Sequence, residues 1–86
     1  MIYGLFHGGY SYACPELDDA EELDSQSHAV RVFRSRVQGR DRRYPGIDDS
    51  AVFDLYFGSH PETMRDPYPD VRLSVGPRGG IRAERV

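Results

Sequence analysis

The residues best suited to chemistry gather near the end of the sequence, in the stretch GPRGGIR at 76–82. Consecutive glycines can turn successive backbone N–H groups into one concavity that binds an anion. An arginine guanidinium adds a two-pronged charged hydrogen bond to a phosphate. We therefore predict an anion-binding site, which requires its arginines to emerge on the same face of neighbouring strands. The predicted binding residues are Arg72, Arg78, Gly79, Gly80 and Arg82.

A second glycine turn, HGG at 7–9, offers a further donor in His7. Aromatic rings in expected loops, among them Tyr10 and Tyr68, can stack on a base. Together these residues predict a site for a nucleotide-type small molecule, although the pattern matches no Walker loop or dinucleotide-binding motif. The alternative is structural: the glycines form a hairpin, the arginines face water, and the tyrosines close the ends of a small core.

The sequence gives less support for a catalytic site or a metal site. The three histidines show no metal-binding spacing, and a single cysteine, Cys14, excludes a disulfide within the chain and a cysteine-based zinc site. Ser11 does not lie in the G-x-S-x-G elbow of hydrolases, and the adjacent acids at 18–19 and 48–49 are explained by turn chemistry. We predict a protein that is not an enzyme and uses no cofactor or metal.

The charges alternate in blocks. Residues 1–24 carry six acids and no arginine, whereas residues 25–45 carry six arginines and one aspartate. We expect such blocks to pair with each other across the fold. The net charge of −3 repels a phosphate backbone, so nucleic acid ranks last among partners. A membrane is not expected, because no apolar run approaches the 18 or more residues of a membrane span.

The elements that must position these residues can be predicted from periodicity. Apolar residues recur at helical spacing over about 26–38, and we expect the arginines of this helix to form a solvated face or to pair with the acidic segment before it. The acidic segment 15–24 is predicted to be an exposed loop that can contain one helical turn. Alternation predicts strands at 2–6, 50–58 and 71–75, with 81–86 able to pair back as another strand.

These elements belong to one small domain over 1–86 with a modest core. Short connections between the later strands favour antiparallel pairing. The predicted fold class is α+β, with one helix packed on a small antiparallel sheet of three to four strands.

The two ends of the chain, LFHGGYSYA at 5–13 and DPYPDVRLSVGPRGGIR at 66–82, resemble a family of small proteins encoded by tailed phages that infect actinobacteria. Similar members start with a short strand and an HGG turn, and place RDPYPD before a strand that ends in GPRGG. The resemblance implies a phage origin and a location in the cytoplasm of the infected bacterial host. It brings no reaction and no established site.

We therefore expect a non-enzymatic phage accessory protein, in one of two versions. The first sequesters a small anionic ligand, such as a nucleotide-derived signal of host defence, by analogy with small oligomeric phage proteins. The second is a protein-interaction module that binds or inhibits a host protein, or a minor virion component. Six tyrosines and four phenylalanines exceed what a thin core needs. A chain this short also gains stability by self-association, which predicts a homo-oligomer.

Overall fold

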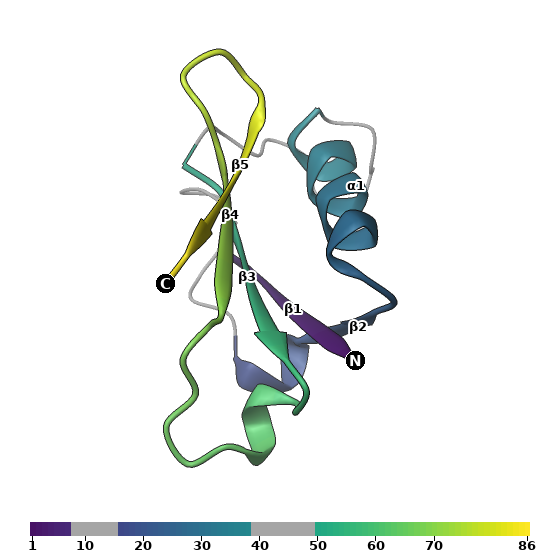
Figure 1. Cartoon of the computed structure of the whole chain (residues 1–86), viewed down its shortest axis with the longest axis vertical. Coiled ribbons are helices and arrows are strands. Elements are labelled where there is room, and N and C mark those ends of the chain that lie inside the picture. Colours follow the sequence, from purple (N-terminus) through teal and green to yellow (C-terminus); the bar gives the residue numbers. More distant parts are fainter. Residues whose placement is uncertain (8–15, 39–49) are drawn as a thin grey trace.

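The computed structural model describes residues 1–7, 16–38 and 50–86. In these ranges the chain forms an antiparallel sheet with strand order β2-β1-β3-β4-β5, and a helix packs on one face of it (Figure 1). No helix there is both long and apolar enough to cross a membrane. The elements are β1 (Ile2–His7), η1 (Leu17–Asp19), β2 (Glu21–Leu23), α1 (Gln26–Val37), β3 (Val52–Phe57), η2 (Pro61–Thr63), β4 (Val71–Val75) and β5 (Ile81–Arg85), where η denotes a 3₁₀-helix.

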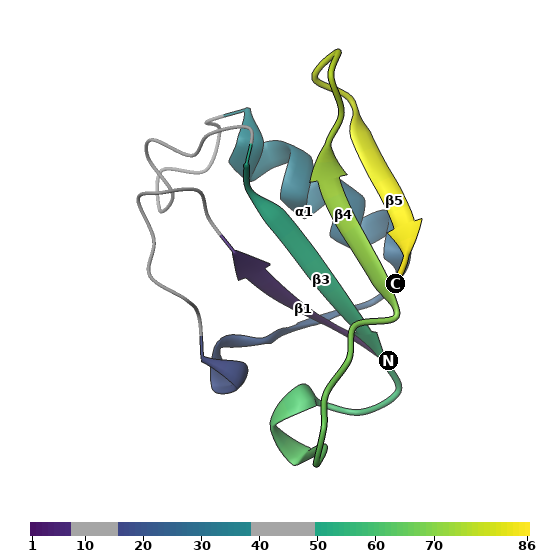
Figure 2. The same ribbon diagram turned by 90° about the vertical axis from the view of Figure 1, so that its left-hand side faces the viewer.

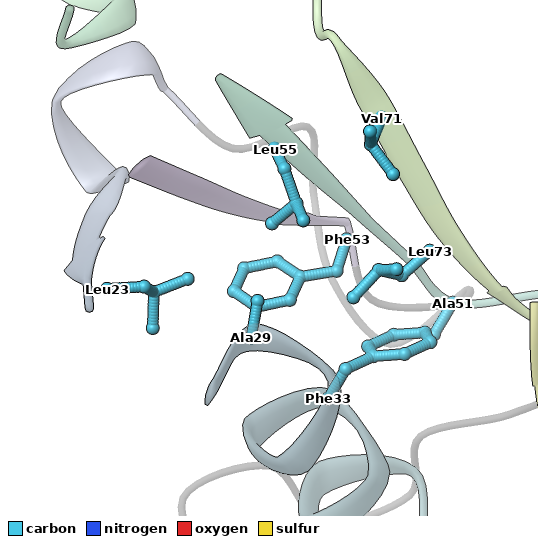
Figure 3. Close-up of a cluster of buried hydrophobic side chains, with 8 residues drawn as sticks. All are labelled: Leu23, Ala29, Phe33, Ala51, Phe53, Leu55, Val71 and Leu73. Carbon is cyan, nitrogen blue, oxygen red and sulfur yellow. The ribbon is translucent and has the colours of Figure 1, made fainter. Parts of the chain in front are cut away.

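The predicted helix is confirmed, and its start has a clear cause. The Ser25 side chain accepts a hydrogen bond from the backbone N–H of His28 (3.1 Å), which caps an otherwise unpaired donor. The apolar stripe of α1 then packs on the sheet, where the Phe33 ring stacks on Phe53 with centroids 6.0 Å apart. The core cluster, drawn in Figure 3, consists of Leu23, Ala29, Phe33, Ala51, Phe53, Leu55, Val71 and Leu73.

The prediction of three to four strands is wrong, because the acidic segment contributes a strand of its own. Part of this segment, Glu21–Leu23, pairs with β1 instead of forming a loop, and Leu23 opposite Ile2 is buried. Acidic residues are depleted in strands, so the composition gave no strand signal. The single helical turn expected nearby is present as η1.

Alternation along the strands divides the side chains between two faces. One face meets α1, while the other, here called the second face, is viewed in Figure 2 with α1 behind the sheet. The second face is not wholly exposed, since Leu5, Asp54 and Tyr56 are buried. Its side chains in β1, β3, β4 and β5 include Tyr3, Leu5, His7, Asp54, Tyr56, Arg72, Arg82 and Glu84.

Candidate functional site

A buried carboxylate on the second face joins three strands. Asp54 of β3, only 3% exposed, lies directly opposite Arg72 of β4. Two hydrogen bonds connect them, from Nε to Oδ1 (2.7 Å) and from Nη2 to Oδ2 (3.2 Å). From β1, Nε2 of His7 lies 3.1 Å from Oδ2 of the same carboxylate. Two predicted site residues, His7 and Arg72, therefore meet at a carboxylate of the protein itself.

The electrostatics of this cluster follow from burial and pairing. Burial raises the pKa of Asp54, but the neighbouring His7 and Arg72 side chains outweigh it and hold that pKa below its ordinary value. The hydrogen bond to Asp54 raises the pKa of Arg72. Burial and the Asp54 charge raise the pKa of Tyr56, which keeps its hydroxyl protonated at neutral pH. Asp54 and Arg72 therefore form an ion pair at neutral pH.

Arg82 is also paired within the chain. The register places Ser74 opposite Arg82 and Arg72 opposite Glu84, so the two arginines emerge on the same face of neighbouring strands, as predicted. However, Nη2 of Arg82 lies 3.1 Å from a carboxylate oxygen of Glu84. Each of these guanidinium groups therefore has a local counter-ion.

The glycine turn at 76–80 closes the β4–β5 hairpin, and Arg78 lies exposed at its tip. Gly79 has φ 80°, a left-handed conformation that favours glycine. Its N–H donates to the carbonyl of Gly76 (3.0 Å), and the carbonyl of Gly80 accepts from the N–H of Gly76 (2.6 Å). The glycines thus form a hairpin turn, as in the structural alternative, and the Gly79 amide is used inside it.

Of the predicted aromatic residues, the structure describes Tyr68, and it does not lie at this turn. Tyr68 precedes β4 whereas Arg78 follows it, so the two are separated by the length of the strand, about 16 Å at the usual rise per residue. Tyr10, like Cys14 and Ser11, lies outside the described residues. The structure therefore does not bring Tyr68 and Arg78 together.

A different surface gathers around Tyr68. Three large apolar side chains, Phe57, Tyr68 and Val86, are 44%, 77% and 67% exposed and line one open hollow of about 500 Å³. We call these three residues the apolar patch. They come from the end of β3, the segment before β4 and the residue after β5. The other residues that line the hollow are Pro69, Asp70, Val71 and Arg85.

Asp70 holds the three segments of the patch together. Its Oδ2 accepts the N–H of Phe57 (2.7 Å), and its own N–H donates to the carbonyl of Leu55 (2.8 Å). Its carbonyl accepts the N–H of Val86 (3.3 Å). These bonds explain why the three segments lie near one another although they are distant in sequence.

Sequence reasoning missed Phe57, Asp70 and Val86 as members of a surface. Alternation placed Phe57 correctly on the face of Phe53 and Leu55, but could not show that a side chain at the end of β3 is only half covered. The one available signal was Tyr68 between two prolines, a context that forbids regular pairing and favours a loop.

The described residues contain no group of three or more histidine, cysteine, aspartate or glutamate side chains placed to hold a metal ion. The chain matches no protein-family model, no curated protein and no solved structure.

Proposed function

We propose that this protein is a non-enzymatic interaction module that binds another protein through the apolar patch. The observation that carries the proposal is the convergence of Phe57, Tyr68 and Val86 on one hollow. Exposed apolar side chains that form a contiguous surface are typical of protein interaction sites. Tyrosine and phenylalanine are also enriched at the centres of interfaces, where they anchor partners.

The anion-sequestering version has less geometric support. An anion on the second face would have to compete with Asp54 for Arg72 and with Glu84 for Arg82. The Gly79 amide would have to leave its bond to Gly76. Protein binding at the apolar patch requires none of these exchanges, because the patch is already exposed.

The partner that fits this surface presents an apolar side chain to the hollow. Asp70 and Arg85 also line the hollow, so the partner can meet charged groups there as well as apolar ones. Following the resemblance to actinobacterial phage proteins, we propose that the partner is a protein of the bacterial host.

The proposal is tested by retention of host protein on the immobilised chain. Tyr68→Asp places a charge in the patch at a position 77% exposed, so the fold should be kept. We expect the wild-type chain to retain one actinobacterial protein and Tyr68→Asp to lose at least about nine tenths of it, the effect of a hot-spot side chain. Arg78→Ala, at the hairpin tip, is the matched control and should retain the protein as wild type does.

The opposite result would support the anion-binding version. In that case nucleotides or inorganic phosphate would raise the melting temperature of the wild-type protein. Arg78→Ala would abolish this rise while remaining folded, and Tyr68→Asp would retain as much host protein as wild type does. This combination of outcomes would overturn the proposal.

A further inference from the structure

The last strand, β5, lies at one edge of the sheet and pairs only with β4 among the described elements (Figure 2). Residues 82–85 are exposed and Ile81 is partly buried. An edge strand presents unpaired N–H and C=O groups to water and can pair with another strand. The orientation of each residue of β5 shows which groups are presented.

Two hydrogen bonds, one at each end of the β4–β5 ladder, show which facing residue pairs are hydrogen-bonded. The N–H of Gly76 donates to the carbonyl of Gly80 (2.6 Å), and the N–H of Val86 donates to the carbonyl of Asp70 (3.3 Å). Bonded and non-bonded residue pairs alternate along an antiparallel ladder. Arg82 and Glu84 therefore direct their backbone groups toward β4. The residues that direct theirs to the free edge are Ile81, Ala83 and Arg85.

We propose that two copies of this chain pair through β5, antiparallel and centred on Ala83. In this register Ala83 faces the partner's Ala83, and Ile81 faces the partner's Arg85. The three residues whose backbone groups face the free edge then form hydrogen-bonded pairs with the partner strand. Every backbone N–H and C=O that β5 directs to this edge is therefore satisfied. The two sheets join into one continuous sheet.

The side chains of β5 favour this register. Arg82 and Glu84, which pair with each other within one chain (3.1 Å), lie opposite the partner's Glu84 and the partner's Arg82, so that the four charges form one alternating group. The pairs between the two chains are non-hydrogen-bonded pairs, in which the side chains of facing residues are closest. On the other face, the stem of Arg85 lies beside the partner's Ile81, whose partly buried side chain gains cover.

Charged residues on an edge strand often prevent pairing. Here the charges have opposite signs and are placed symmetrically about Ala83, so they are complementary in the antiparallel pair of identical chains. A parallel pair in the same register would place Arg82 beside the partner's Arg82. The charge pattern therefore selects a second copy of this chain in one orientation.

A charge-reversal cycle tests the proposal, with molar mass measured by sedimentation equilibrium over a range of concentrations. We expect the wild-type chain to dimerise, and Arg82→Glu and Glu84→Arg each to weaken the dimer by about tenfold or more, because each variant places like charges opposite each other twice. An equimolar mixture of the two variants should form a mixed dimer, and the double variant should recover. Glu22→Arg, an exposed position on the opposite edge strand, is the control and should dimerise as wild type does.

A second variant tests whether backbone hydrogen bonds between the two β5 strands hold the dimer. Ala83→Pro removes an N–H that points to the free edge, so the β4–β5 ladder keeps its bonds while the dimer loses two. We expect a folded monomer. A wild-type chain that stays monomeric at every concentration, or a dimer insensitive to all of these substitutions, would overturn the proposal.

Discussion

At the scale of single residues, Asp54 shows how a predicted site can be occupied by the protein itself. Arg72 and His7 were expected to serve an anion, and in the structure both lie against this carboxylate. No sequence pattern identifies Asp54 as the partner, because it sits between apolar residues in β3 and meets Arg72 only through the strand register. Because Asp54 and Arg72 lie on neighbouring strands, their ion pair also stabilises the pairing of β3 with β4.

The Asp54 ion pair predicts a pH dependence. Its pKa lies below the ordinary value of 3.8, so its stabilisation is fully present above that value and is lost as the pH falls through the lowered pKa. At pH 5 we expect Asp54→Asn to reduce the free energy of unfolding by about 2 kcal/mol, the effect of losing a charged hydrogen bond. Urea unfolding of the wild-type protein and of Asp54→Asn, in the same buffer at each pH between 5 and 2, should show the difference in free energy of unfolding shrinking as the pH falls. A difference that stays constant or grows would contradict the assignment.

At the scale of elements, close packing between β1, β3 and α1 sets the core. Arg36 of α1 is almost fully buried, and its guanidinium lies over the Phe6 and Phe53 rings. Its Nη1 lies 2.6 Å from Oε1 of Glu21 in β2. The expected alternative, in which a helix arginine pairs with the preceding acidic segment, is therefore confirmed for Arg36, while a wholly solvated arginine face is wrong. The reason is that β2 brings Glu21 beside the C-terminal half of α1.

Gly4 of β1 lies directly against the Phe53 ring and leaves no room for a side chain. A methyl group there would overlap the Phe53 ring and would approach Leu23 to 2.9 Å. We expect Gly4→Ala to lower the free energy of unfolding by about 1–3 kcal/mol, as overpacking usually does. Gly80→Ala is the control, since nothing lies within 4 Å of the added group. The denaturant midpoint of Gly4→Ala should be lower than that of Gly80→Ala. Equal midpoints would contradict the prediction, because they would show that β1 accommodates the methyl group with no loss of stability.

At the scale of the whole molecule, the sequence predicted more of the scaffold than of the binding surface. Periodicity predicted α1, β3 and β4, because each carries a regular apolar pattern. A short apolar run predicted β1, and the glycine turn after β4 predicted that β5 could pair back. It missed β2, where acidic side chains hide a strand formed by pairing with β1. The apolar patch could not be predicted, because its three segments are brought near one another by the tertiary hydrogen bonds of Asp70.

The most direct test of the account is photo-crosslinking inside bacterial cells. A photoreactive phenylalanine analogue placed at position 68 should form an adduct whose mass equals this chain plus one host protein. The same analogue at position 78, at the far end of the β4–β5 hairpin, should form none. Adducts to host protein from position 78 and none from position 68 would contradict the claim that the apolar patch is the binding surface.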